Sequence, residues 1–515
     1  MQDSFSNLQK ILKRNSKILN YRYRGERTFV VVPGLNHPKY VDLSKVQGLK
    51  YTEERMFFFL FLLKYKNTKI VYVTTKGFNK DLFNYYVGLI SEDEADMNER
   101  LKRLVHIEVD NKKNMALVHK VLDNPGIIEK IKNELDNPER TVLRTYNVTE
   151  AERELAIKLG VPLFGSGQKF DFIGTKSGAR KMFRLAKANT IPGFEDIMHF
   201  NDLIASIVKL IKKYPNYKKL MIKRNYSSSG KGNCIVRIGH LLEDHNVDSV
   251  RTDSQKLEKI IKANLKDYMI FQKEDEVYAD YVKKFNQSGG IIELYIPGQI
   301  KYSPSTQVLI NADKKARIVS THEQILGGPD NQLFLGCKFP TIPSHRRLII
   351  KEGEKIANVL AQKGIIGNFA IDYVVVYDKN HKNPIVWPIE INLRKGGTTH
   401  PFRTAFFLTG AIYNPTTGNL MSGKTPIHYY AMDFIEDQKY RQFNSEELIN
   451  LVKNSKISFN KETKQGVLLY ITGMLEEYGR FGAICIGQSA EEAEEYYKKM
   501  IKVINQHLKK SGSSR

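Results

Sequence analysis

Three oxygen-bearing side chains in the second half of the chain have the types and spacing of a magnesium site. Asp372 lies in the alternating apolar run 368–376, and Glu390 and Asn392 lie in the run 385–392. Alternation along a strand puts Glu390 and Asn392 on one face, and Asp372 can face them from an adjacent antiparallel strand. Carboxylate and amide oxygens suit Mg²⁺, which keeps waters and shares substrate phosphates. We expect a metal site here, because acids placed within apolar strands are seldom only solvated.

Cationic and glycine-rich segments near these acids could bind phosphate groups. Arg394 follows Asn392 directly, and Lys176 stands at the predicted start of a helix. Lys223 lies in the short apolar strand 220–224, which leads into a loop whose backbone N–H groups could approach phosphate oxygens. The predicted phosphate-binding part of that loop consists of Ser228, Ser229, Gly230, Lys231 and Gly232. Taken alone, Lys176 could be a solvated surface lysine and the loop a hairpin turn, and P-loop spacing is absent.

Two further segments carry candidate binding residues. The apolar strand 291–296 contains Glu293, Leu294 and Ile296 and ends at Pro-Gly, a connector against which an adenine ring could lie; an edge strand with a turn is the alternative. His322 could be a base, a substrate contact or a structural histidine, and the sequence alone favours the structural role. We retain His322 and Arg403 as candidate substrate contacts.

The elements that must position these residues fall into three parts. A length of 515 residues is typical of roughly three domains. Strands at 28–32, 68–73 and 104–109 alternate with helices and predict a parallel, Rossmann-like α/β unit. Thr149 is a good N-cap for a helix that ends at Gly160. We therefore predict a mixed α/β (α+β) protein with domains at 1–160, 161–425 and 426–515.

Composition limits the other classes of function. Three widely spaced cysteines argue against a disulfide framework or a zinc site, and the apolar run 56–63 is too short to span a bilayer. No secretory signal is visible, so a cytoplasmic location is expected. The net charge of +24 could favour binding to nucleic acid, to a membrane surface or to anionic small substrates. The lysines form no long basic block, which disfavours nucleic-acid binding.

The order of these segments resembles the ATP-grasp superfamily and, more closely, the pheganomycin-type peptide ligases with pre-ATP-grasp and C-terminal domains. The resemblance covers nearly the whole chain. Its most specific parts are residues 390–401 and 320–328, with 336–340 after them, and Tyr51 to Arg55 resembles the pre-ATP-grasp pattern.

The resemblance implies a role for each matching residue. Lys176 and Lys223 would contact ATP phosphates, and the loop from Ser228 to Gly232 would close over them. Glu293, Leu294 and Ile296 would flank the adenine. Asp372, Glu390 and Asn392 would hold two Mg²⁺ ions, with Mn²⁺ as an alternative, and Arg394 would steady the γ-phosphate or the acyl phosphate. The acid that binds ribose in many members is missing, because Gln299, Ile300 and Lys301 occupy those positions.

The sequence therefore predicts an ATP-dependent carboxylate–amine ligase that forms an acyl phosphate and joins it to an amine, without a covalent enzyme intermediate. Its partners would be small-molecule or peptide carboxylates and amines, and the N-terminal domain would help to form their cleft. A homodimer through the C-terminal domain stays open. Two other functions stay open as well, namely a catalytically silent nucleotide-binding scaffold and an ATP-grasp kinase of small molecules.

Overall fold

The N-terminal part is a parallel sheet with helices on both faces. The computed structural model describes residues 2–36, 43, 46–110, 115–227, 230–245, 253–273, 275–296, 301–328, 333–377 and 383–512. The sheet has the order β3-β2-β1-β4, and every pair is parallel. Its strands are β1 (Arg27–Val32), β2 (Thr68–Thr75), β3 (Leu104–Val109) and β4 (Thr141–Thr145). All residues of β1 and β4 are buried, as expected of a parallel sheet covered on both faces.

Helices and short helical turns complete this part, and the predicted cap at Thr149 is confirmed. Thr149 and Glu152 form a capping box at the start of α6, and Gly160 ends that helix with a φ of 70°. The helical elements are α1 (Gln2–Arg14), η1 (Ser16–Leu19), η3 (Leu49–Lys64), α2 (Asp81–Gly88), α3 (Glu94–Leu101), α4 (Leu117–Leu122), α5 (Pro125–Asn133), η4 (Pro138–Arg140) and α6 (Glu150–Leu159).

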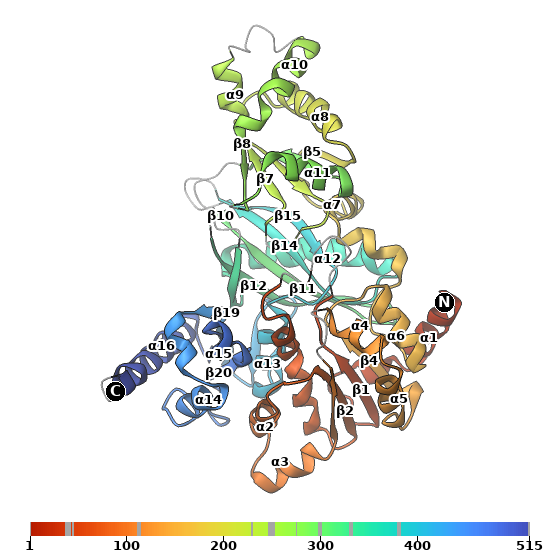
Figure 1. Ribbon diagram of the computed structural model, residues 1–515, viewed down its shortest axis with the longest axis vertical. Coiled ribbons are helices and arrows are strands. Elements are labelled where there is room, and N and C mark those ends of the chain that lie inside the picture. The colour runs from red at the N-terminus through yellow and green to blue at the C-terminus, as the bar shows by residue number, and fades with distance from the viewer. Residues whose placement is uncertain are drawn as a thin grey trace.

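A separate lobe is built on an antiparallel sheet with the order β5-β9-β6-β7-β8. It lies at the top of Figure 1, and helices pack on its sheet around an apolar cluster of their own. Its strands are β5 (Gly193–Ile197), β6 (Leu220–Arg224), β7 (Asn233–Val236), β8 (Met269–Phe271) and β9 (Gly290–Leu294). Its helical elements are α8 (Phe200–Lys213), α9 (Ile238–Asp244), α10 (Ser254–Asn264), η7 (Leu265–Tyr268) and α11 (Tyr278–Ser288).

The central sheet runs without a break into the C-terminal part. Its order is β10-β14-β11-β12-β13-β19-β21-β20, with β15 paired to β14, and β13 is antiparallel to β19. The strands are β10 (Lys301–Tyr302), β11 (Pro304–Ile310), β12 (Ala316–Gly327), β13 (Leu333–Phe339), β14 (Gly367–Val376), β15 (Ile385–Asn392), β19 (His428–Glu436), β20 (Gly466–Tyr470) and β21 (Arg480–Gly487). The sheet thus crosses the boundary predicted near residue 425, and both predicted domain boundaries stay predictions.

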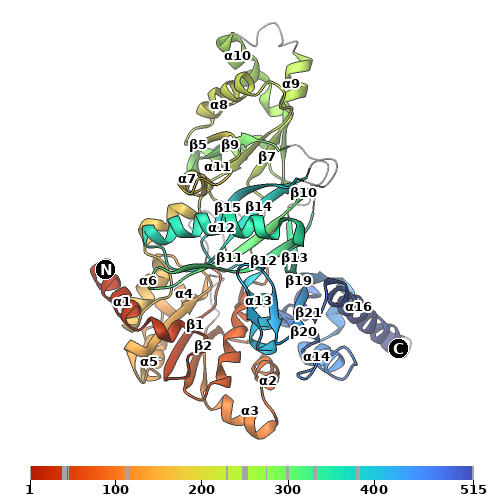
Figure 2. The same ribbon diagram turned by 180° about the vertical axis from the view of Figure 1, so that it is seen from behind.

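Helices cover this sheet, and a small three-stranded sheet lies beside it. The helix α12 runs along the central strands, as Figure 2 shows from behind. The helical elements are η5 (Gln168–Gly174), α7 (Lys176–Leu185), α12 (Pro343–Lys363), α13 (Thr399–Thr409), η9 (Gln438–Gln442), α14 (Ser445–Lys453), η10 (Thr472–Met474), α15 (Leu475–Tyr478) and α16 (Ala490–Gly512). The small sheet comprises β16 (Ile412–Tyr413), β17 (Leu420–Ser422) and β18 (Thr425–Pro426). No helix in the described ranges is long and apolar enough to cross a membrane.

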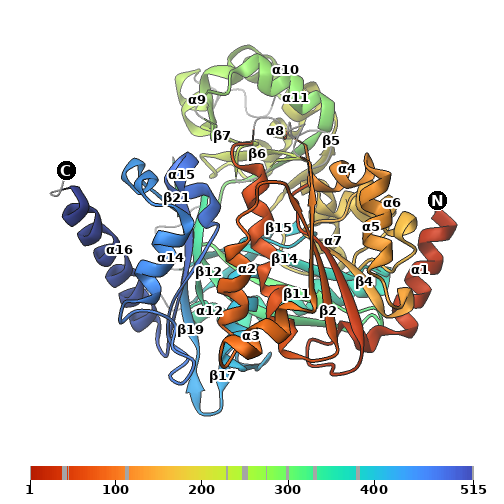
Figure 3. The same cartoon turned by 60° about the horizontal axis from the view of Figure 1, so that its bottom comes forward.

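The parallel and antiparallel sheets together confirm the predicted mixed α/β class. The run 56–63, which the sequence analysis found too short to span a bilayer, is part of the helical segment η3 and is fully buried. Figure 3 shows the helices α2 and α3 between the N-terminal strands and the C-terminal strands, and one apolar cluster joins both terminal parts to the central part. This continuity positions η3 next to the C-terminal part.

A buried carboxylate fastens η3 to the C-terminal part. Glu54 is 1% exposed, and its Oε1 accepts a hydrogen bond of 3.1 Å from the backbone N–H of Gly473. The N–H groups of Ile471 and Thr472 also stabilise this carboxylate. Burial, the largest influence, nevertheless raises the pKa of Glu54 to about 8. The contact therefore joins two segments that are far apart in the sequence.

We predict that Glu54→Ala lowers the free energy of unfolding by about 1–3 kcal/mol, because it leaves buried N–H groups without an acceptor. Glu54→Gln keeps an acceptor oxygen and should lose less. Denaturant unfolding of both variants measures the effect, with the exposed Glu92→Ala as the matched control. Unchanged stability of Glu54→Ala would show that this contact does not hold the two parts together.

Candidate active site

The structure brings the three candidate metal ligands together on two adjacent strands. In the antiparallel register of β14 and β15, Asp372 lies opposite Glu390, and Ala370 lies opposite Asn392. The amide Nδ2 of Asn392 donates to Asp372 Oδ2 over 2.7 Å. Gln324 Nε2 donates to the other carboxylate oxygen over 3.2 Å, a contact that the sequence did not indicate. The three residues selected by strand alternation thus lie together on two adjacent strands.

A lysine shares this site and sets its electrostatics. Lys176 Nζ lies 2.5 Å from Glu390 Oε1, and Thr175 caps the start of α7 by accepting a hydrogen bond from the N–H of Gly178. Burial favours a higher pKa for Glu390, but the charge of Lys176 and then that of Arg394 hold this pKa below its usual value. Burial and the nearby Glu390 raise the pKa of Asp372. Glu390 is therefore the more strongly acidic of the two carboxyl groups.

These side chains fit a magnesium ion that is shared with a ligand. In the described part of the chain, no group of three or more His, Cys, Asp or Glu side chains could hold a metal ion. Two carboxylates and one amide fall short of a complete protein cage. They match the way in which Mg²⁺ is held by one or two carboxylates together with substrate phosphates. The two-ion assignment and the bridging role of Glu390 stay predictions.

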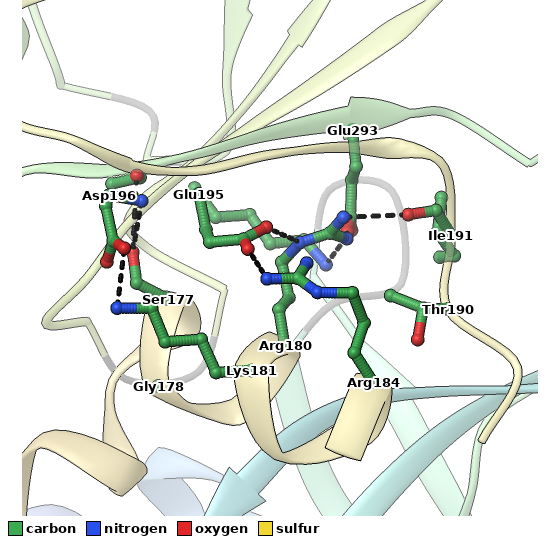
Figure 4. Close-up of polar contacts among 12 residues, drawn as sticks. Ser177, Gly178, Arg180, Lys181, Arg184, Thr190, Ile191, Glu195, Asp196 and Glu293 are labelled. Atoms are coloured by element: carbon green, nitrogen blue, oxygen red, sulfur yellow. Dashed lines mark hydrogen bonds and ion pairs between the residues drawn. The ribbon is translucent and has the colours of Figure 1, made fainter. Parts of the chain in front are cut away.

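A second ion-pair network positions Lys223. Lys223 Nζ lies 2.6 Å from Glu293 Oε1, and Arg180 Nη1 lies 2.7 Å from Glu293 Oε2. Arg180 also contacts Glu195 over 3.1 Å and donates to the carbonyl of Ile191 over 2.9 Å. Figure 4 shows Arg180 and Arg184 extending from α7 toward Glu195, with Glu293 beyond them. The carboxylate of Glu293 thus neutralises two buried cations.

This network changes the role expected of Glu293 and adds Arg180, which the sequence analysis did not select. Glu293 is 4% exposed and holds Lys223 and Arg180, so its side chain is occupied by ion pairs. Any adenine contact from this strand falls to its neighbours Leu294, Tyr295 and Ile296, which line the cavity. The sequence contained a signal for Arg180, because it lies four residues after Lys176 and thus on the same face of a helix.

Most of the candidate residues, although not Lys176, His322 or Arg403, border one cavity of about 1320 Å³, which is larger than most single-ligand pockets. Its walls come from the lobe, the central sheet and both terminal parts. Residues 228 and 229 lie outside the described residues, whereas Gly230 and Lys231 line the cavity. The lining residues on which the following argument draws are Met221, Lys223, Glu293, Leu294, Tyr295, Ile296, Asp372, Glu390, Asn392, Arg394, Arg55, Gly396, Gly397 and Asp433.

Two candidate substrate contacts are corrected by their positions. His322 is fully buried and does not line the cavity; its Nε2 lies 2.5 Å from the Tyr429 hydroxyl, and burial lowers its pKa to about 3. Arg403 is 4% exposed, and its guanidinium lies over the Tyr21 ring, 4.7 Å from the centroid. Neither residue can reach a ligand in the cavity, because both are enclosed by protein. His322 has the structural role that the sequence alone favoured.

We predict that His322 and the equally buried His400 make stability fall with decreasing pH. The pKa of each is about 3 in the folded protein, against a usual value of 6.5. The unfolded chain therefore binds more protons, and stability present above pH 6.5 is lost as pH falls toward 3. At pH 5 each histidine lowers the free energy of unfolding by about 2 kcal/mol relative to its value above pH 6.5. Urea unfolding measures the loss of unfolding free energy between pH 7 and pH 5. This loss should be smaller for His322→Gln than for wild type, whereas the exposed His240→Gln should lose as much as wild type.

Comparison with known proteins places this site in a family context. Residues 169–415 match the family model "IQCH-like, ATP-grasp", and residues 447–500 match "PGM1 C-terminal domain". The chain is 22% identical over 457 residues to L-propargylglycine–L-glutamate ligase of Streptantibioticus cattleyicolor, covering 88% of this chain and 89% of that protein. It is 21% identical to IQ motif-containing protein H of Danio rerio, covering 77% of this chain but only 40% of that protein.

A solved structure shares the fold over most of the chain. It is the biotin carboxylase domain of Hydrogenobacter thermophilus 2-oxoglutarate carboxylase, in complex with MgADP, ADP and bicarbonate. The TM-score is 0.54 at 11% identity, covering 93% of this chain and 90% of that domain. The family model that residues 169–415 match is of the ATP-grasp kind, and the solved structure shares the fold over most of the chain.

Proposed function

We propose that the protein is an ATP-dependent carboxylate–amine ligase that works through an acyl phosphate. The observation that carries the proposal is the convergence of Asp372, Glu390 and Asn392 with Lys176 and Arg394. Acids that can hold a divalent ion lie directly beside cations that can hold phosphate. Phosphoryl transfer needs this combination of charges, because it depends mainly on positioning and electrostatic stabilisation.

The charges have separate tasks in this proposal. Lys176 and Lys223 bind the phosphates of ATP, and Asp372, Glu390 and Asn392 hold the metal. Mg²⁺, when bound, would neutralise the phosphates and polarise the γ-phosphoryl group. Arg394 lines the cavity two residues after Asn392, where it can stabilise the negative charge of the transferred group.

The reaction then joins two substrates without a covalent enzyme intermediate. A carboxylate oxygen of the first substrate attacks the γ-phosphorus, and ADP leaves. The nitrogen of the amine substrate attacks the resulting acyl carbon, phosphate leaves, and the amine loses a proton. An enclosed site protects the acyl phosphate from water. The loop from residue 228 to 232, predicted to close over the phosphates, would contribute to that protection.

The size of the cavity and one relative support two substrates in addition to ATP. About 1320 Å³ leaves room beyond a nucleotide, and the additional walls come from the terminal parts of the chain. The relative from S. cattleyicolor is by its name a ligase of two amino acids. We extend this to an amino acid or peptide as the carboxylate substrate, in keeping with the pheganomycin-type resemblance.

We predict that Glu390→Ala reduces the rate of Mg²⁺-dependent ADP release with substrates by about 100-fold or more, because it removes a metal ligand from the centre of charge transfer. Coupled ADP detection and mass spectrometry of the products measure the effect. The exposed Glu354→Ala is the matched control and should behave as wild type. Near-normal turnover of Glu390→Ala would refute the metal assignment. ADP release without an amide product would favour the kinase or a simple ATPase.

We also predict that Lys223→Met raises the KM for ATP by about 10- to 100-fold, which corresponds to the loss of one charged hydrogen bond. Glu293 keeps Arg180 as a partner in this variant, so the fold should persist. Steady-state kinetics measure the change, with the exposed Lys259→Met as the control. An unchanged KM for ATP would exclude Lys223 from phosphate binding.

A further inference from the structure

The wall of the cavity contains a pair of opposite charges that ATP binding does not use. Arg55 Nη2 lies 2.9 Å from Asp433 Oδ2. Arg55 belongs to η3 in the N-terminal part, and Asp433 belongs to β19 in the C-terminal part. Both residues line the cavity, and their side chains are 19% and 3% exposed. The pair therefore lies where the two terminal parts meet around the cavity.

The residues around this pair fix its position but leave part of its hydrogen-bonding capacity unused. Asp433 lies in an irregular stretch of β19, between Met432 and Ile435, where a bulge can redirect a side chain. The hydroxyl of Tyr470 donates to Asp433 Oδ1. Among the described residues, Asp433 Oδ2 has only the ion pair with Arg55 as a polar contact, and Arg55 Nε has no hydrogen-bond partner. Because buried polar atoms are normally satisfied, the pair has donor and acceptor capacity left for a ligand.

The segment that follows the metal ligands also holds this pair. The backbone at Gly397 passes so close that an added Cβ would lie 3.0 Å from Asp433 Oδ2. His400, three residues later, lies with its Nδ1 3.1 Å from the carbonyl oxygen of Arg55, to which it donates. Arg394 begins the same segment, and Arg394, Arg55 and Asp433 all line the same cavity. The pair belongs to the part of the cavity wall that the terminal segments form.

We propose that Arg55 and Asp433 bind the amine substrate, and that this substrate is a free α-amino acid. Arg55 takes its carboxylate and Asp433 its ammonium group, which an α-amino acid carries on one carbon. This inference rests on the proposed ligase function. The carboxylate that reacts must lie at the γ-phosphate beside Arg394, so a second arginine is required only for a carboxylate that does not react. That carboxylate belongs to the amine substrate.

The two charges also account for selectivity. An amine without a carboxylate would offer the Arg55 guanidinium no anionic partner beyond Asp433, and a charged hydrogen bond of the missing kind contributes about 1.5–3 kcal/mol. An α-amino acid should therefore be preferred over its carboxamide by about 10- to 100-fold. Asp433 contacts the ammonium group, which the acid and its carboxamide share, so it should not distinguish them.

The test uses the full-length protein with ATP and Mg²⁺ and proceeds in two steps. Hydroxylamine first replaces the amine substrate, and hydroxamate formation with single amino acids and short peptides identifies the carboxylate substrate. With that substrate fixed, the twenty L-amino acids and their carboxamides are compared as amines by product mass. Wild type should prefer the acids by about 10-fold or more. Equal use of acids and carboxamides would overturn this inference.

Variants then separate the two residues. Arg55→Gln should raise the KM for amino acids about 10- to 100-fold and abolish the preference over carboxamides. Asp433→Asn should raise the KM for both kinds of amine, and neither change should alter the KM for ATP by more than about twofold. The exposed Arg441→Gln is the control. Arg55→Gln with an unchanged KM and preference would overturn the assignment.

Hydroxamate formation also separates the possible failures. Hydroxylamine has no carboxylate for Arg55 to bind, so Arg55→Gln should lower hydroxamate formation much less than it lowers the use of amino acids, whereas the exposed control Arg441→Gln should change neither. If wild type forms no hydroxamate from any carboxylate tested, the proposed function fails, whatever these two residues do. Should a variant be too unstable to form hydroxamate, the comparison of acids and carboxamides with wild type still decides the inference.

Discussion

The candidate site can contain buried charge only because its two buried lysines, Lys176 and Lys223, each have an acid within ion-pair distance. Lys176 is paired with Glu390, and Lys223 shares Glu293 with Arg180. An unpaired charge at such depth would cost several kcal/mol. These pairs therefore determine where the side chains of α7, β6, β9 and β15 must lie. In the proposed reaction the phosphates of the nucleotide replace the acids as partners of Lys176 and Lys223, and Glu390 binds the metal ion.

The strands and the metal-ligand positions could be predicted from the sequence, because both depend on local patterns. Alternation in 368–376 and 385–392 placed Asp372, Glu390 and Asn392 on facing sides of β14 and β15. Strand patterns likewise located β1, β2 and β3, and the cap at Thr149 located α6. The run 56–63 is apolar at every position, so it has no periodicity that separates helix from strand.

Contacts between distant segments could not be predicted in this way. Arg180 and Glu293 are 113 residues apart in the sequence, and their ion pair follows only from the packing of α7 against β9. His322 has the residue type of a catalytic group, yet its burial depends on the packing of Tyr429 and Phe339 around it. Glu293 was predicted to lie at the nucleotide site, but the ion pairs of its carboxylate with Lys223 and Arg180 were not predicted.

The antiparallel pairing of β13 with β19 has a consequence for any attempt to isolate a smaller catalytic unit. A protein ending near residue 425 would lose β19, so the backbone N–H and C=O groups of β13 that now bond to it would face solvent. An uncovered strand of this kind is a template on which other molecules add their own strands. Shortened forms would therefore expose β13 as an edge strand, whereas in the whole sheet β19 covers β13 and the edge strand is β20.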